Sequence, residues 1–156
     1  MSKDIIEVVK NAEGFRPGKP IALEQVEQAQ KELGVKFADD YIKYLLEFGN
    51  AFLISVDLLG IENDPMFKYA SVVYETLEEK KYDPTAPADM YVIENLGIDG
   101  VLAWQHENGA VYYKYRYDEG LQKAADSLAE YIENSFEKKK KKLIKQLSCY
   151  IDILYF

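Results

Sequence analysis

Apolar and polar positions in the first third of the chain alternate with the period of a helix. A short helix is predicted behind Ser2, ending near Gly14, and a second ends at Gly34, where a left-handed residue stops it. A third helix begins at Asp39 or Asp40, either of which caps its free amides, and ends at Gly49. The stripes that predict these helices are Ile5, Ile6 and Val9; Leu23, Val26 and Leu33; and Tyr41, Leu45 and Phe48.

The middle of the chain mixes short apolar runs with one further helical pattern. The run 51–56 is typical of a buried strand, and 58–61 of a second short extended piece. A helix opening at Asp64-Pro65 is predicted from apolar positions three and four apart: Phe67, Ala70, Tyr74 and Leu77. A loop is expected at 83–87.

From Met90 onward the pattern has the period of a strand. Strands are predicted at 91–93, 101–105 and 110–116, with a two-residue hairpin turn at Asn108-Gly109. That turn puts Leu102, Trp104, Val111, Tyr113 and Tyr115 on the core face, and Ala103, Gln105, Tyr112, Lys114 and Arg116 on the polar face. A final helix after Asp118 carries Leu121, Ala125, Leu128 and Ile132 on one stripe and runs into the lysines.

These elements predict an α+β fold, with a mainly antiparallel sheet packed against N-terminal helices and a C-terminal helix. At 156 residues with 48% hydrophobic side chains, the chain matches one domain with one core. We expect the domain to span 1–156, with a lysine-rich and apolar extension at about 138–156.

Charge is distributed unevenly along the chain. Residues 1–137 hold 13 basic and 26 acidic side chains, a net of −13, whereas 138–156 hold six Lys and one Asp, a net of +5; together they give the total of −8. An acidic body repels phosphate backbones and attracts basic surfaces. A basic protein is therefore the expected partner rather than DNA or RNA, although acidity that only aids solubility is an equal alternative.

The sequence holds few candidates for chemistry. His106, the only histidine, lies beside a hairpin turn with no second histidine or cysteine near it, and Cys149 is isolated in an apolar tail. The stretch 95–100 resembles the start of a calcium loop but lacks ligand residues that such a loop needs. No phosphate-binding glycine loop or hydrolase motif occurs. We expect no catalytic residue, metal or cofactor.

The cysteine count and the ends of the chain bear on location. A lone cysteine, no signal peptide and no apolar run of about 20 residues predict a cytoplasmic protein without a membrane segment. The lysines at 138–142 are expected to form a solvated helix end, with Glu137 pairing with Lys141. Acidic lipid or nucleic acid is the less favoured partner for them.

Several short stretches together resemble the SUKH superfamily, the Smi/Knr group. The helix hairpin 33–41 with Leu45 and Phe48-Gly49-Asn50 carries most of the resemblance. Later stretches follow in the family's order: 58–61, 91–94, 97–100 with Trp104, the hairpin 107–109 with 111–113, and 127–132. The resemblance covers about 20–135, and Ala38 stands where the family usually has a proline.

The resemblance implies a bacterial immunity protein of the YobK type. Such a protein binds and neutralises the toxic domain, commonly a nuclease, of a polymorphic L-X-G toxin, and performs no chemistry. The expected contact residues lie on loops or on the polar hairpin face: Glu62, Asp64, Asp99, Glu107 and Tyr112. Two alternatives stay open, a non-catalytic protein-interaction regulator and a small hydrolase using surface carboxylates, which would show an acidic cleft with perturbed carboxyl groups.

Overall fold

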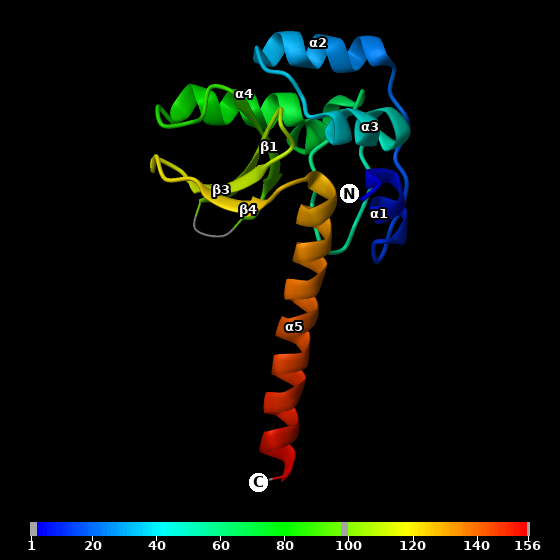
Figure 1. Cartoon of the computed structure of the whole chain (residues 1–156), viewed down its shortest axis with the longest axis vertical. Helices are drawn as coiled ribbons and strands as arrows, with labels where there is room; N and C mark the ends of the chain where they lie inside the picture. Colours follow the sequence, from blue (N-terminus) through cyan, green and yellow to red (C-terminus); the bar gives the residue numbers. More distant parts are fainter. Residues whose placement is uncertain (1–2, 98–99, 156) are drawn as a thin grey trace.

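The computed structural model describes residues 3–97 and 100–155; past Ser135 it describes only some side chains of the last helix. The helices and strands in chain order are α1 (Ile5–Asn11), α2 (Leu23–Leu33), α3 (Asp39–Phe48), the 3₁₀ helix η1 (Pro65–Ala70), α4 (Val72–Tyr82), β1 (Met90–Asn95), β2 (Val101–His106), β3 (Val111–Tyr115), β4 (Gln122–Ala125) and α5 (Leu128–Tyr155). All but α5 gather in one body, from which α5 projects (Figure 1).

The four strands form one sheet in the order β1-β2-β3-β4, and every neighbouring pair is antiparallel. This confirms the predicted α+β class. Tyr91, Val92 and Ile93 are all fully buried, so both faces of β1 are covered. The Thr76 hydroxyl of α4 accepts the Val92 N–H on one face (3.0 Å), and the Tyr91 hydroxyl accepts the Ala38 N–H beside α3 (2.9 Å).

The hairpin between β2 and β3 forms where predicted, but its register differs by one residue. Trp104 pairs with Tyr112 rather than Tyr113, because the loop is three residues long. The Gly109 N–H donates to the His106 carbonyl (2.9 Å), and Gly109 has a positive φ of 100°. A turn followed by a left-handed glycine adds one residue to the loop and shifts the opposite strand.

The shift exchanges the two faces of β3, so the predicted face assignment is wrong. Lys114 joins Leu102 and Trp104 on the face towards α4 and is buried, and Tyr112 is half-buried beside it. Gln105 is also buried, whereas Tyr115, assigned to the core, is exposed.

The predicted helices α1, α2 and α3 are confirmed, with different caps at two of them. Asp4 caps α1 through the Ile6 N–H (3.1 Å), and the N-cap of α3 is Ala38, which offers no side-chain bond. The sequence predicts that Asp39 or Asp40 caps α3. The Asp40 carboxylate instead accepts the N–H of Leu128 at the start of α5. Gly34 and Gly49 end α2 and α3 with φ of 65° and 64°.

Three other predictions were wrong. The apolar run 51–61 contains no strand but only isolated bridges, Arg16 with Phe52 and Gly60 with Ser71. The helix expected from Asp64 breaks at Ser71 into η1 and α4, and its stripe residues Phe67 and Leu77 are exposed. Residues 122–125 form β4 rather than the start of the last helix.

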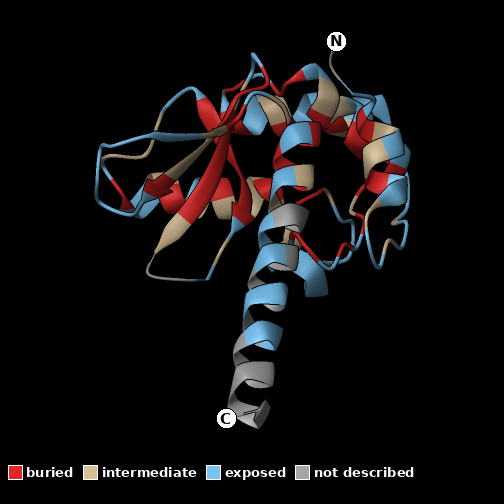
Figure 2. Cartoon of the chain, turned by 60° about the horizontal axis from the view of Figure 1, so that its bottom comes forward, coloured by how far each residue is buried: buried red, intermediate tan, exposed pale blue. Residues whose placement is uncertain are grey.

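One hydrophobic core fills the space between the sheet and the N-terminal helices (Figure 2). Its centre is aromatic: the rings of Phe37, Tyr41 and Tyr91 contact one another with centroids 4.6–5.2 Å apart. Buried hydroxyls find backbone partners, since Tyr41 donates to the Leu59 carbonyl (2.6 Å) and Tyr44 accepts the Ala51 N–H (2.9 Å). These bonds fix the irregular segment after α3.

Helix α5 joins the body only through its first turns. Leu128, Ala129, Tyr131 and Ile132 are buried, and the helix then continues to Tyr155 (Figure 1). The lysines at 138–142 therefore lie inside a helix and not at its end, contrary to the prediction. The side chains of Glu137 and Cys149 lie outside the described part of the structure. Within 3–97 and 100–155, no helix is long and apolar enough to cross a membrane.

Candidate partner-binding groove

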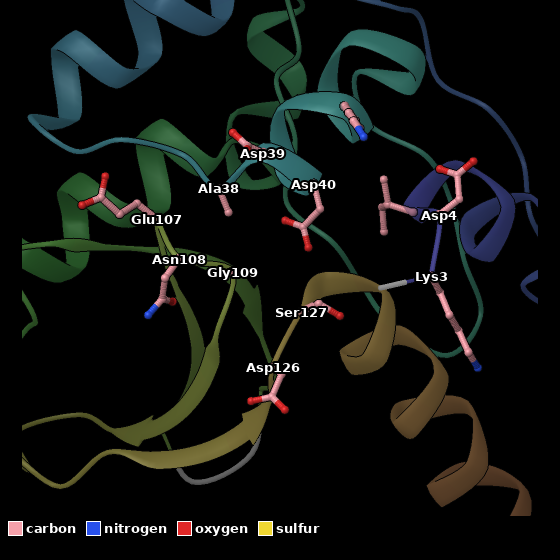
Figure 3. Close-up of a pocket in the computed structure, with 12 residues that line it drawn as sticks. Lys3, Asp4, Ala38, Asp39, Asp40, Glu107, Asn108, Gly109, Asp126 and Ser127 are labelled. Carbon is pink, nitrogen blue, oxygen red and sulfur yellow. The ribbon is translucent and has the colours of Figure 1, made fainter. Parts of the chain in front are cut away.

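A groove opens where the starts of three helices meet the β2–β3 turn (Figure 3). It has a volume of about 590 Å³. Lys3 and Asp4 come from the start of α1, Asp39 and Asp40 from α3, Glu107 from the turn, and Asp126 and Ser127 from the approach to α5. The groove is thus assembled from four segments far apart in the sequence.

The groove is acidic. Five carboxylates line it, on Asp4, Asp39, Asp40, Glu107 and Asp126, against two lysines, Lys3 and Lys43, which leaves a formal charge of −3. Lys3 is also engaged by Glu133 (2.5 Å), and Asp126 by Lys123. Among the described residues, no group of His, Cys, Asp and Glu is arranged to hold a metal ion. The surface suits the basic side chains of a partner.

Four of the five acids gather here because they lie near the start of a helix, and Glu107 joins them from the β2–β3 turn. Carboxylates are favoured at helix N-termini, where free N–H groups and the helix dipole offer positive charge. The Ser127 hydroxyl accepts the Glu130 N–H (3.1 Å) in the first turn of α5. Three helices that start at one place therefore concentrate carboxylates there.

Asp40 organises the groove. One of its oxygens accepts the Leu128 N–H (2.8 Å), and the other accepts from the Gln105 amide (3.1 Å). The same amide donates to the Gly109 carbonyl (3.0 Å), and the Gln105 side-chain oxygen accepts from the Tyr91 hydroxyl (2.7 Å). This chain of bonds ties α3, the hairpin and α5 together.

Burial raises the pKa of Asp40 above its ordinary value, against the opposing hydrogen bonds from Leu128 and Gln105. A perturbed carboxyl in an acidic cleft is what the hydrolase alternative expects. Both oxygens of Asp40, however, already accept hydrogen bonds within the fold. This arrangement favours a structural role for Asp40 over that of an acid or base.

The structure does not bring the predicted contact residues together. Glu107 is exposed in the groove, whereas Glu62 and Asp64 are exposed on a separate hollow beside 17–21. Tyr112 is half-buried and lines neither, and Asp99 lies outside the described residues. Sequence reasoning missed Asp39 and Asp126 as groove residues; the signal that marks them is an acidic residue at or just before a helix start.

His106 and the tyrosines take structural positions. The His106 ring contacts the Asp89 carboxylate (Nε2 to Oδ2, 3.1 Å) and accepts the Asn108 N–H at Nδ1 (3.2 Å), which supports the hairpin turn. Tyr113 is half-buried against Tyr131, with ring centroids 6.0 Å apart.

The chain matches a known protein family. A family model described as "SUKH_5: SMI1-KNR4 cell-wall" matches residues 2–137, which is most of the chain and includes the whole acidic groove. The match extends beyond residues 20–135, the range covered by the resemblance in the sequence, and stops where α5 leaves the body. No curated protein matches the chain.

Proposed function

We propose that this chain, which belongs to the SUKH_5 family of SMI1-KNR4 proteins, is an immunity protein that binds and neutralises a protein toxin. Immunity proteins are associated with the SUKH superfamily. In this proposal the toxin is polymorphic, of the L-X-G type, with a basic nuclease domain, and is met in the cytoplasm of the cell that makes it. The protein performs no reaction of its own.

The acidic groove is the observation that supports this proposal best. Its net charge of −3 belongs to a body that carries −13 over residues 1–137. A nuclease must present cationic side chains to phosphates, and an acidic surface competes for those side chains while repelling nucleic acid. Complementary charge also speeds encounter between the two proteins.

Contact residues follow from the geometry. Asp39, Glu107 and Asp126 approach the groove from three different segments and are all exposed, so they are the proposed centre of the interface. Glu62 and Asp64 belong to a second acidic surface, which is a rival docking position. Tyr112 and Asp99 stay proposed contacts, although Tyr112 lines neither hollow and Asp99 lies outside the described residues.

Co-expression with the toxin domain encoded beside the gene tests this function. The wild-type chain should restore growth and co-purify with the toxin. Changing Asp39 and Glu107 to Lys should abolish both effects, whereas Glu62→Lys with Asp64→Lys, a matched charge change on the other hollow, should not. If the wild type neither protects nor binds, the proposed function is wrong; if only the second pair matters, the interface lies at the other hollow.

A protein-interaction regulator is the second candidate, because the family description refers to the cell wall. It would use the same fold and charge but a different partner. Failure to protect against the neighbouring toxin, together with tight binding to another basic protein, would favour it.

A further inference from the structure

The projecting part of α5, residues 138–155, is here called the α5 arm. It runs for about 27 Å at the ordinary helical rise and leaves the body in both views (Figures 1 and 2). Two large apolar side chains on it, Ile144 and Leu147, are 58% and 60% exposed. Lys138, Lys141 and Lys145 are exposed as well.

Such a helix is poorly stabilised alone. Isolated helices of this length are marginal in water, and like charges four residues apart, as in Lys141 and Lys145, weaken them further. The arm therefore needs a covering surface that supplies both apolar contact and negative charge.

A hollow with an apolar wall lies at the root of the arm. The groove there, called the base groove, has a volume of about 630 Å³ and lies between the segment 52–57, the end of β1, Tyr113 and the start of the arm. Phe52 on its wall is 57% exposed, and Asp57 adds an exposed carboxylate. The buried Ser55 hydroxyl, also on this wall, has no hydrogen-bond partner among the described residues.

We propose that the α5 arms of two copies pair antiparallel, each resting its far end on the base groove of the other. Because the groove lies beside Lys138, where the arm begins, antiparallel overlap along the arm's length brings the far end of one arm to the partner's groove. The two-fold axis then passes between residues 146 and 147, midway along the arm, so Leu147 of one copy faces Leu147 of the other and Ile144 lies close by.

Charge fits this occupant. All six lysines of the arm lie in 138–145, and its one acid is Asp152. Antiparallel overlap therefore keeps the lysine runs of the two arms apart and brings each run towards the acid-bearing half of the other arm, whereas parallel overlap would bring like charges together. Apart from Asp152, the far end at 150–155 is apolar or aromatic in sequence, which suits the exposed Phe52 on the wall of the base groove.

Contact along one side of a helix about 27 Å long and roughly 10 Å wide buries less area than the roughly 800 Å² per partner of a standard interface. The base grooves supply additional contact. An anionic bilayer would attract the lysines of the arm, but it would leave the base groove unfilled and repel the acidic body.

Measurement of mass in solution tests the pairing on the full chain. The wild type should run at twice 18.0 kDa, about 36 kDa. Ile144→Glu with Leu147→Glu, and separately Phe52→Glu, should each raise the dissociation constant at least tenfold. Leu23→Glu is the matched control, because Leu23 is 51% exposed on α2, away from the arm, and should leave the dimer intact. A monomeric wild type, or a dimer unaffected by the two disruptive changes, would overturn the proposal.

Cross-linking tests the orientation. In a Cys149→Ser background, Leu147→Cys lies next to the axis and should form a disulfide-linked dimer, whereas Lys138→Cys, near the root, should not. Equal cross-linking of both variants would mean parallel arms and reject the arrangement. Wild-type protein that floats as a monomer with phosphatidylglycerol vesicles would reject it in favour of a lipid surface. None of these measurements involves the toxin, so the pairing stands or fails separately from the proposed function.

Discussion

The carboxylate of Asp40 on α3 caps α5 by accepting the N–H of Leu128, 88 positions later in the chain (2.8 Å). Asp40→Ala should lower the free energy of unfolding by about 1–3 kcal/mol, because the Leu128 N–H and the Gln105 amide both lose their acceptor. Urea unfolding measures the loss. Asp39→Ala is the control, since Asp39 is exposed next to it, and should change stability by no more than about 0.5 kcal/mol.

A buried ion pair joins the loop after α4 to β3. Lys114 and Asp83 are 2% and 3% exposed, with Nζ and Oδ2 3.1 Å apart. Asp83 also accepts the Tyr117 N–H, where the backbone has a positive φ of 63°. Lys114→Ala should cost about 3–5 kcal/mol, because it leaves a buried carboxylate without its partner. Lys123→Ala, which breaks an exposed pair, should cost less than about 1 kcal/mol.

The same pair predicts a pH dependence. Burial alone would raise the pKa of Asp83, but hydrogen bonds from Thr85, Tyr117 and Lys114 outweigh burial and hold the pKa well below the ordinary value. A lowered folded-state pKa stabilises the fold above the ordinary value of 3.8, and that contribution is lost as the pH falls below it. Asp83→Asn should therefore be much less stable than wild type at neutral pH, and the gap should narrow in acid. A gap that stays constant with pH would contradict this assignment.

Two glycines with nearly equal φ should respond differently to alanine. A Cβ at Gly34 meets nothing within 4 Å, whereas one at Gly49 would lie 2.0 Å from the Lys19 carbonyl oxygen. Gly34→Ala should cost about 1–2 kcal/mol from the left-handed backbone alone. Gly49→Ala should cost clearly more, because the backbone near Lys19 must also move. Equal losses in thermal or urea unfolding would contradict the close contact.

Association with the proposed toxin should be steered by the acidic groove. Reversal of Asp39 and Glu107 to Lys should slow association about tenfold or more at low salt and flatten its salt dependence. Stopped-flow measurement at low and high ionic strength checks both effects. The Glu62 and Asp64 reversal is the matched control, and an equal effect from it would assign the steering to the net charge alone.

Local signals in the sequence are sufficient to predict the elements that have a strong hydrophobic periodicity or a clear turn motif. The stripes of α2 and α3 and their terminal glycines predicted both helices, and Asn108-Gly109 predicted the hairpin. Register was not predictable in the same way, because one further residue in the loop exchanges the faces of β3. The burial of Lys114 depends on Asp83, 31 residues earlier, which no local pattern reveals.

The apolar run 51–61 after α3 is wrongly predicted to be extended strand for a related reason. Its backbone is satisfied by scattered partners rather than a neighbouring strand: the Leu59 N–H donates to the Ile93 carbonyl (2.8 Å) and the Asp57 N–H to the Glu94 carboxylate (2.7 Å). Similarly, Glu107 is an expected contact residue, but its placement with Asp39 and Asp126 results from the meeting of the hairpin turn with three helix starts. Only the tertiary fold defines that groove.

The bonds at the start of α5 also bear on the order of events during synthesis. Lys3 pairs with Glu133 across 130 positions, and Asp40 cannot find Leu128 until nearly the whole matched domain has been translated. Contacts this distant in sequence form late in folding. A nascent chain halted on the ribosome before Leu128 would therefore leave its N-terminal helices without this partner, so the proposed binding surface is completed only after Leu128 has been released.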